Sequence, residues 1–401
     1  MKTAIVILNW NGKHFLEEFL PILISETPEE TSIIIADNGS TDDSIDWIEH
    51  SIINKYNNDS NASSNARLGH GIYNYSTDRE IHKFDINNLH IIRFDSNLGF
   101  TVGYNKALEQ IDAEYYVIMN SDIRVPSYKE LIKYTQGLDS NWLTPMIDFL
   151  DNHPEAGICM PKILSEREYI KNSKNIFEYA GASGGFIDKY GYPFCRGRIL
   201  SNVESDTGQY NTPTQIFWAS GACMVIRSSL FKLLGGFDKD FFAHMEEIDL
   251  CWRAKLLGWQ IWVIPQSKVY HVGGGTLPNN SPRKLYLNYR NNLLMLYKNL
   301  PLKDESWQAF GYKNRRNRNL HIFVRQIIDG MSAIVYILQG KIEFFKAVVK
   351  AHKDFHKMKG EVTISPRLKN FYNSNSNIGI YKKSIIKSFF CNKRRFSDLD
   401  I

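Results

Sequence analysis

Uninterrupted apolar runs, each ending in polar residues, recur along the first third of the chain. The runs include "TAIVIL", "SIIIA", "LHII" and "YYVIM", and segments with helical spacing such as "HFLEEFLPIL" and "YNKALEQI" lie between them. Apolar runs without polar alternation are typical of strands that are buried on both faces. Strands that alternate with helices predict an α/β fold, with a mostly parallel sheet flanked by helices. In such a sheet, ligands bind beyond the carboxyl ends of the strands.

Amide and carboxylate side chains stand at these predicted strand ends. The amides are Asn9, Asn11, Asn38, Asn97, Asn105 and Asn120, and the carboxylates are Asp37 and Asp122. The turn after the first run, "NWNGKHF", is neither a P-loop nor a dinucleotide fingerprint. Asp37 can accept a hydrogen bond from the N–H of a pyrimidine base, and Asp122 suits Mg²⁺ or Mn²⁺ attached to a diphosphate. Taken singly, each aspartate also fits a turn or a helix cap, but their recurrence at successive strand ends favours a ligand pocket.

Three carboxylates crowd into four positions of "HMEEIDLCW": Glu246, Glu247 and Asp249. Asp249 and Arg253 are four residues apart on a predicted helix, so we expect them to pair. Crowded carboxylates raise one another's pKa, as a general base working near neutral pH requires. The segment therefore holds the candidates for a catalytic base.

A further apolar run, "VIPQSKVYHVGGGT", ends at His271. A lone histidine is more often structural than a ligand. Here it precedes three glycines, Gly273 among them, whose backbone amides can approach a phosphate closely. The pattern therefore predicts a metal-binding or diphosphate-binding role for His271.

The stretch "AGASGGFIDKYGYPFCRGR", residues 180–198, is rich in glycine and aromatic residues. It fits an acceptor-side loop on which sugars stack, with Tyr190, Tyr192 and Phe194 as candidates. Trp218, further along the chain, is another acceptor candidate. A surface loop with its aromatic side chains packed beneath it fits equally well.

The chain divides into three parts by composition. Residues 1–300 form the predicted catalytic domain, and its Asn- and Ser-rich segment 54–80 is expected to be a mobile surface insertion. Residues 301–359 contain recurring apolar pairs, which predict an amphipathic helical extension interrupted at Gly330 and Gly340. Residues 360–401 are polar and basic, and we expect poor order there.

Positive charge concentrates at the end of the chain. Residues 341–401 hold fourteen Lys and Arg against five acidic residues, a formal charge of +9, whereas the whole chain carries +5. Lys346, Lys350 and Lys353 lie opposite Phe344 and Val348, as on a helix at an anionic membrane surface. The alternatives are that this apolar stripe packs on the catalytic domain or forms a dimer, or that the tail is simply solvated. No nucleic-acid partner is predicted, and the oligomeric state stays open.

Two further observations concern the compartment. The five cysteines are scattered and odd in number, which suits a reducing environment better than a disulfide framework. No window approaches the roughly 18 uninterrupted apolar residues of a membrane span. We therefore expect a cytoplasmic protein, peripheral at the inner face of the cell membrane.

Seven segments in order resemble the inverting family-2 glycosyltransferases of GT-A fold: "VILNWNG", "IIIADNGSTDDS", "NLGFTVGYNKAL", "VIMNSDI", "SGACMVIR", "GGFDKDFFAHMEEIDLCWRAKLLG" and "VYHVGGG". The nearest branch is that of the rhamnosyltransferase-like enzymes of bacterial surface-polysaccharide synthesis, and the resemblance covers about residues 3 to 300. It implies a nucleotide-diphosphate sugar donor, with rhamnose as the candidate sugar, and a glycan or lipid-linked acceptor. It also implies a divalent metal and a one-step displacement at the anomeric carbon.

The resemblance also assigns roles. Asp37 is expected to bind the nucleobase, and Asp122, in the "NSD" that replaces the family's D-x-D, to hold the metal together with His271. The asparagines at the strand ends and Gly273 line the donor side. Arg290, in "RNN", is the candidate for neutralising the leaving group. "FTVGYN" departs from the family's more glycine-rich form, which leaves the donor preference open.

The catalytic base is placed by the same resemblance. Glu247 falls where the family has its base, usually an aspartate, and Glu246 and Asp249 remain alternatives. A different class of function is a catalytically silent nucleotide-sugar-binding protein on the same fold, which Asn120 and Glu247 would suit. A sugar nucleotidyltransferase is disfavoured, because that chemistry needs a Gly-rich first loop bearing Arg or Lys.

Overall fold

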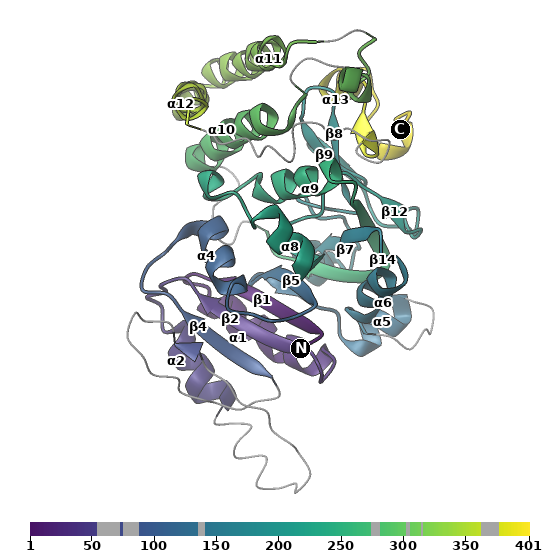
Figure 1. The fold of residues 1–401 in the computed structure, drawn as a ribbon. Coiled ribbons are helices and arrows are strands. Elements are labelled where there is room, and N and C mark those ends of the chain that lie inside the picture. Colours follow the sequence, from purple (N-terminus) through teal and green to yellow (C-terminus); the bar gives the residue numbers. More distant parts are fainter. Residues whose placement is uncertain are drawn as a thin grey trace, which may run out of the picture.

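The computed structural model describes residues 1–53, 73–74, 88–134, 141–273, 281–301, 305–313, 316–361 and 377–401. A ten-stranded sheet forms the centre of the molecule, with helices on both sides (Figure 1). Its strands, in chain order, are β1 (Thr3–Asn9), β2 (Ser32–Asp37), β3 (Tyr73–Asn74), β4 (Leu89–Arg93), β5 (Tyr115–Asn120), β6 (Ile123–Arg124), β7 (Ala156–Ser165), β12 (Thr214–Gln215), β13 (Cys223–Arg227) and β14 (Gln260–His271).

The first half of this sheet is parallel, as the sequence predicts. β1 pairs with both β2 and β5, and β2 pairs with β4, in parallel. The register sets Asn9 opposite Asp37 and Leu8 opposite Asn120, so the strands end at one edge. All six residues of β2 are buried, which confirms that helices cover both faces.

The second half of the sheet is mixed. β13 runs antiparallel between β5 and β7, and β14 runs parallel to β7. β6 pairs antiparallel with β14, and this pairing sets His271 opposite Ile123. The sheet is therefore mostly parallel, as expected. Near its middle, the antiparallel strand β13 lies between β5 and β7 and joins the two halves of the sheet.

Helices cover the sheet and extend the molecule at one end. In chain order they are α1 (Lys13–Glu26), α2 (Ser44–Trp47), the π-helix η1 (Ile48–Ile53), α4 (Gly99–Leu108), α5 (Tyr128–Tyr134), α6 (Thr144–Asn152), α7 (Glu166–Asn172), α8 (Ser228–Leu234), the 3₁₀ turn η2 (Lys239–Phe241), α9 (Glu246–Leu256), α10 (Pro282–Asn299), η3 (Glu305–Phe310), α11 (Arg318–Leu338), α12 (Ile342–Met358), α13 (Ile385–Phe390) and η6 (Phe396–Asp398).

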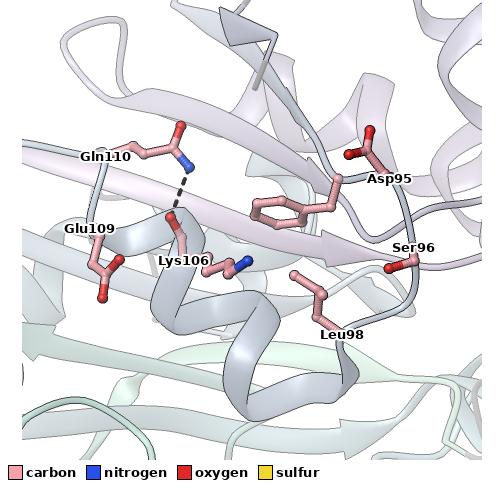
Figure 2. A pocket seen from close by; sticks show the side chains of 7 residues that line it. Asp95, Ser96, Leu98, Lys106, Glu109 and Gln110 are labelled. Atoms are coloured by element: carbon pink, nitrogen blue, oxygen red, sulfur yellow. Dashed lines mark hydrogen bonds between the residues drawn. The ribbon is translucent and has the colours of Figure 1, made fainter. Parts of the chain in front are cut away.

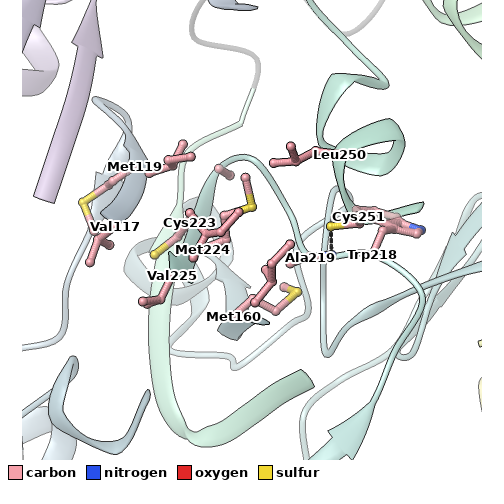
Figure 3. Close-up of a cluster of buried hydrophobic side chains, with 14 of the residues drawn as sticks. Val117, Met119, Met160, Trp218, Ala219, Cys223, Met224, Val225, Leu250 and Cys251 are labelled. Carbon is pink, nitrogen blue, oxygen red and sulfur yellow. Dashed lines mark hydrogen bonds between the residues drawn. The ribbon is translucent and has the colours of Figure 1, made fainter. Parts of the chain in front are cut away.

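Helix α9, which carries the crowded carboxylates, is anchored in the core. Figure 3 shows Leu250 and Cys251 of α9 on one side of a buried cluster that also includes Met119 of β5, Met160 of β7 and Met224 of β13. The Cys251 sulfur also accepts a hydrogen bond from the Ala219 amide at 3.4 Å. Such packing fixes the position of the helix start, and hence of the carboxylates, relative to the strand ends.

A second, five-stranded sheet corrects one expectation. It comprises β8 (Gly185–Asp188), β9 (Pro193–Cys195), β10 (Arg198–Ile199), β11 (Asn202–Val203) and β15 (Ile380–Tyr381). β15 belongs to the tail in which we expected poor order, and for residues 377–401 that expectation is wrong. β15 pairs in parallel with β8, and Tyr381 and Ile385 are buried. The partner strand lies far away in the sequence, so the local composition could not reveal it.

The predicted insertion 54–80 falls mostly outside the described residues. Within it, Tyr73–Asn74 forms β3 beside β4, at the edge of the central sheet. The expectation for 54–72 and 75–80 concerns residues that the structure does not describe.

The C-terminal helices settle how the amphipathic extension packs. Val348 and Phe355 of α12 are buried, and the Phe355 ring contacts Tyr297 of α10 with centroids 6.1 Å apart. This apolar face of α12 therefore packs on the protein, as the alternative interpretation has it. Gly340 does separate the two helices, with a positive φ of 72°. Gly330 does not, because α11 runs through it; a glycine inside a helix costs only about 1 kcal/mol.

Helix α11 is strongly apolar although polar and charged residues interrupt it, so a search for uninterrupted apolar runs does not find it. Within the described residues it alone is long and apolar enough, by length and composition, to cross a membrane. Only 28% of its most apolar 18-residue window is buried inside the protein.

Candidate active site at the strand ends

The donor side begins where β1 and β2 end. Asn9 is fully buried, and its Nδ2 donates to Asp37 Oδ1 at 3.1 Å and to Ser40 Oγ at 3.2 Å. Asp37 Oδ2 accepts from the Ser40 amide at 3.1 Å. The buried Oδ1 of Asn9 has no hydrogen-bond partner among the described residues. The structure thus brings the two predicted residues together and holds the Asp37 carboxylate in one orientation.

Asn11 and Asn97 support the rim of this side. Asn11 adopts a positive φ of 51°, and its Oδ1 accepts from the Thr41 amide at 2.7 Å. Asn97 Oδ1 accepts from Asn38 Nδ2 at 3.1 Å and from the Gly99 amide at 2.8 Å. These bonds join the end of β2 to the start of α4.

Asn105 belongs to the packing, not to the ligand side. Its Nδ2 donates to the Phe237 carbonyl and its Oδ1 accepts from the Phe237 amide, both at 2.8 Å. Both amide atoms face the protein, so the prediction of donor binding is wrong for this residue. The sequence around Asn105 does not show whether its side chain faces the protein or the ligand pocket.

Asp122 and His271 meet, as the sequence predicts for a shared metal. Asp122 Oδ1 lies 3.2 Å from His271 Nε2, and Glu178 Oε2 lies 3.5 Å from His271 Nδ1. All three side chains are about nine-tenths buried or more. Although burial lowers it, Asp122 and Glu178 raise the pKa of His271 to about 10. The same two carboxylates therefore attract the imidazole electrostatically.

Glu178 is a site residue that sequence reasoning missed. Although burial raises the pKa of this carboxyl, His271 holds it below its ordinary value. The Glu178 carboxylate also accepts a hydrogen bond from the Ala180 amide. A partner on the far ring nitrogen orients a metal-binding histidine and fixes its tautomer. The sequence signal was one glutamate in the otherwise apolar "NIFEYAG", which is too weak to single out.

The donor set fits a metal that arrives with its substrate. No group of three or more His, Cys, Asp or Glu side chains with metal-holding geometry occurs in the part of the chain that the structure describes. Mg²⁺ is commonly held by one or two protein ligands together with substrate phosphates and waters. Asp122 offers one carboxylate for such an ion, and His271, which contacts it at 3.2 Å, is the second candidate ligand.

The three crowded carboxylates differ sharply in their surroundings. Asp249 is fully buried and accepts from Arg253 Nε and Asn299 Nδ2, each at 2.7 Å. The predicted ion pair is confirmed, and together with Asn299 it gives each of the two carboxylate oxygens a hydrogen-bond donor within the protein. Glu246 is buried, and burial followed by the Glu247 charge raises its pKa well above the ordinary value.

Glu247 has the properties of a base. It is only partly buried, and burial raises the pKa of its carboxyl to about 7. Its Oε2 atom has no hydrogen-bond partner among the described residues. A carboxylate with such a pKa can take a proton from a hydroxyl near neutral pH.

Backbone contacts bring Glu247 to the metal-side strand end. A Cβ built on Gly221 would lie 3.4 Å from the Cβ of Glu247, an ordinary van der Waals distance, so the two segments lie side by side. The next residue, Ala222, accepts a hydrogen bond from the Asn120 amide at 2.9 Å. Asn120, two residues before Asp122, and Glu247 therefore both contact the "SGAC" segment.

The loop before α9 is strained and held from α10. Phe242, His244 and Met245 all have positive φ values, of 66°, 72° and 73°. Asn291 Nδ2 donates to the Phe241, Ala243 and His244 carbonyls at 2.7–2.9 Å. Strained backbone of this kind persists where the surroundings over-determine it, and it clusters at functional sites.

Arg290 contacts the same loop. Its Nη2 donates to the Asp240 and Phe241 carbonyls at 3.2 and 3.0 Å, and its Nε to Asn291 Oδ1 at 2.8 Å. The "RNN" element thus holds the loop of the base. A leaving-group role for Arg290 stays a prediction.

The acceptor candidates are largely committed to packing. Trp218 is buried and donates its indole N–H to the Phe186 carbonyl at 3.0 Å. Tyr192 donates its hydroxyl to Asp329 at 2.7 Å beneath the Arg325 guanidinium. Phe194 is fully buried. For these three the packed-loop alternative is the correct one, whereas Tyr190, partly buried beside His321, keeps its place as a candidate.

Gly273 lies at the end of the described part of its loop. Its φ is +73°, and a Cβ there would lie 3.0 Å from Glu178 Oε1. The remaining glycines of "GGG" fall within 274–280, outside the described residues.

A surface pocket of about 370 Å³ is lined by residues on either side of Asn97, such as Ser96 and Leu98. Figure 2 shows its lining beside α4, with Asp95, Ser96, Leu98 and Lys106 from the β4–α4 segment. No predicted site residue lines it.

Comparisons with known proteins agree with the motifs. No family model matches the chain. An N-acetylglucosaminyl-diphospho-decaprenol L-rhamnosyltransferase of Mycobacterium tuberculosis is 25% identical over 267 residues, which cover 67% of this chain and 75% of that protein. Rhamnosyltransferase WbbL of Escherichia coli is 22% identical over 179 residues, covering 44% of this chain and 60% of that protein.

The fold is shared with a solved glycosyltransferase. The structure of S. aureus TarS 1-349 in complex with UDP-GlcNAc has a TM-score of 0.50 at 15% identity, covering 92% of this chain and 83% of that one. At this identity the likeness shows the fold alone. Together the sequence relatives and the shared fold support a rhamnosyltransferase-like glycosyltransferase of family 2 with the GT-A fold.

Proposed function

We propose that the chain transfers a sugar, with rhamnose as the first candidate, from a nucleotide diphosphate to a glycan or lipid-linked acceptor, with inversion at the anomeric carbon. The observation that carries the proposal is one partly buried glutamate, Glu247, with a pKa of about 7, joined through the "SGAC" loop to the strand end of Asp122. The sequence relatives, one named for a decaprenol-linked acceptor, support the donor and acceptor classes.

The chemistry follows from charge and proton balance. The bond between the anomeric carbon and the diphosphate oxygen breaks while the acceptor oxygen forms its new bond from the opposite face. Glu247 takes the proton of the acceptor hydroxyl, a contribution of about 10²–10⁴ in rate. One base suffices and no covalent sugar intermediate forms.

Asp122 and His271 would hold a divalent ion with the diphosphate. When bound there, such an ion supplies electrostatic stabilisation of the departing phosphates. Glu178 orients His271 toward it, and Asn9 and Ser40 orient Asp37 toward the base of the nucleotide. Each of these side chains binds or positions the donor, and Glu247 acts on the acceptor.

The direct test is consumption of sugar nucleotides. Purified protein is incubated with dTDP-, UDP- and GDP-sugars in Mn²⁺ or Mg²⁺, and release of the nucleoside diphosphate is measured. We expect one donor class to be consumed, EDTA to stop the reaction, and Asp122→Ala to lose both turnover and metal-dependent donor binding. Asp148→Ala, an exposed aspartate on α6, is the matched control and should behave as wild type.

Two outcomes would contradict parts of the proposal. Full activity in EDTA would remove the metal role and leave the transferase intact. Tight donor binding with no consumption of any donor, with or without a lipid-linked acceptor, would favour the silent binding protein.

A further inference from the structure

Helix α11 is built with its charged side inward. Its charged residues, Arg318, Arg325 and Asp329, are all buried. Its outer side carries a row of large apolar side chains at helical spacing, each 48–81% exposed: Leu320, Phe323, Ile327, Met331, Ile334, Val335 and Leu338. We call these seven residues the outer row. Soluble proteins rarely expose a contiguous apolar surface of this extent unless it binds something.

Buried polar contacts fix this orientation. Arg325 Nε pairs with Asp329 at 2.9 Å, and Arg325 Nη1 donates to Asn292 at 2.6 Å and to the Tyr190 carbonyl at 3.1 Å. Tyr192 donates to Asp329. Turning the outer row toward the protein would leave this buried pair without partners, which is unfavourable. The exposed row is therefore a fixed feature of the fold.

The neighbouring helix adds positive charge beside the row. The exposed face of α12 carries Ile342, Lys346, Val349, Lys353 and Lys357 at spacings of three and four. Gln326 of α11 contacts His356 of α12 at 3.1 Å, and the rings of Tyr336 and Phe344 lie 5.5 Å apart, so the helices run side by side. Figure 1 shows both at the end of the molecule far from the parallel strands.

The positive charge of this surface distinguishes between two possible binding partners, a second copy of the chain and an anionic lipid membrane. Residues 316–361 hold nine Lys and Arg against four acidic residues. A second copy docked by the same surface would set the two lysine faces near each other, which repels. An anionic lipid surface attracts the lysines, each by about a fivefold gain in binding, while the acyl region accepts the apolar row.

We propose that the outer row of α11, flanked by the exposed lysines of α12, docks on an anionic lipid surface. The row enters the interface, and the lysines contact the headgroups. Arg325 and Asp329, on the inward side of α11, contact Tyr190 and Tyr192, so docking would leave the 190–192 loop behind α11, about 10 Å, one helix diameter, from the lipid surface. The inference does not depend on which donor the enzyme uses.

The test uses the full-length chain and liposome flotation. Phosphatidylcholine vesicles with phosphatidylglycerol should carry the protein upward, high salt should weaken this, and phosphatidylcholine alone should carry little. Ile327→Glu with Ile334→Glu should reduce the bound fraction by about tenfold or more, as two charges in the interface oppose insertion. Lys346→Gln with Lys353→Gln should reduce binding to the anionic vesicles only.

Matched controls separate docking from folding and from catalysis. Ile170→Glu with Leu233→Glu changes exposed apolar residues on α7 and α8 and should leave flotation unchanged. All variants should keep the wild-type melting temperature and, with a soluble donor, wild-type donor consumption. Flotation of the α11 variant equal to wild type would overturn the proposal. So would a wild-type dimer in sedimentation that the α11 variant dissociates, with no vesicle binding, because it would show that a second copy covers the row.

Discussion

Three carboxylates that look alike in "EEID" have three different surroundings. Asp249 is bound by Arg253 and Asn299, Glu246 is buried, and Glu247 keeps an oxygen without a partner among the described residues. The helix periodicity turns Asp249 toward α8 and α10, whereas Glu247 faces the "SGAC" loop. At the scale of single residues, the neighbours on other elements decide which carboxylate can be the base.

Glu247→Gln should retain donor binding and lose transfer. The amide keeps the size of the side chain but cannot take a proton, so kcat should fall by about 10² or more. For the wild type, the pKa of about 7 means that the carboxyl is protonated in acid, so kcat/KM should rise with pH through about 7 and then level off. Steady-state kinetics from pH 5 to about 9, with donor binding by calorimetry, measures both. A Gln variant with the wild-type rate would move the base elsewhere.

Asp249→Asn should destabilise the fold. The substitution removes the negative charge that pairs with the buried Arg253. Breaking a buried ion pair in this way lowers the free energy of unfolding by about 3–5 kcal/mol. Denaturant unfolding measures it. The matched control is Glu343→Gln, whose partner Lys346 is exposed, and this change should cost less than about 1 kcal/mol. Equal effects would show that the buried pair is not a stabilising element.

At the scale of elements, the loop 240–245 is held by α4 and α10 beside the candidate active site. The Phe242 carbonyl accepts from the Phe100 amide at 2.9 Å at the start of α4, and Asn291 of α10 holds the neighbouring carbonyls. The loop thus lies between the donor side, where α4 begins, and the base at the start of α9. Three left-handed residues in four positions need such support.

Asn291→Ala should impair catalysis more than stability of the whole fold. Its loss frees three carbonyls, so the loop relaxes and Glu247 shifts. A misplacement of about 1 Å can cost about 10² in rate. We expect kcat to fall with KM nearly unchanged and the melting temperature to drop by a few degrees. Asn319→Ala, an exposed asparagine on α11, is the control with no expected effect. A fall in stability without any change in kcat would show that the loop does not position the base.

At the scale of the whole molecule, the end of the chain completes the second sheet. β15 pairs with β8, and Asp188, which ends β8, accepts from the Ile385 amide at 2.9 Å and from the Tyr190 and Tyr192 amides. Burial raises the pKa of Asp188 to about 6. The last residues of the chain therefore hold the loop that carries the remaining acceptor candidate, Tyr190.

Tyr381→Ala should destabilise the protein. The side chain is 1% exposed and its hydroxyl pairs with Ser388 at 2.8 Å, so truncation leaves a cavity and costs about 3–5 kcal/mol. Phe390→Ala is the matched control, because that ring is 80% exposed, and should change stability by less than about 0.5 kcal/mol. Thermal unfolding compares the two. If both variants were equally stable, residues 377–401 would be a loosely packed tail, as the composition predicts.

Local pattern determined much of this protein. The uninterrupted apolar runs determined the buried strands, and the polar residues that stop them placed Asn9, Asp37 and Asp122 at one sheet edge, because parallel strands end on the same side. The spacing of four determined the Asp249–Arg253 pair. These features depend on neighbours within a few residues, or on the geometry of the sheet alone.

Tertiary structure decided which polar groups are free and which are used. Glu178 reaches His271, Asn105 holds Phe237, and Tyr192 binds Asp329 across 137 residues of sequence. The pairing of β15 with β8 and the inward charges of α11 likewise depend on partners from distant segments. A hydrogen-bond partner brought by another element leaves no trace in the local spacing of residues, so only the assembled fold could show that α11 turns its apolar row outward.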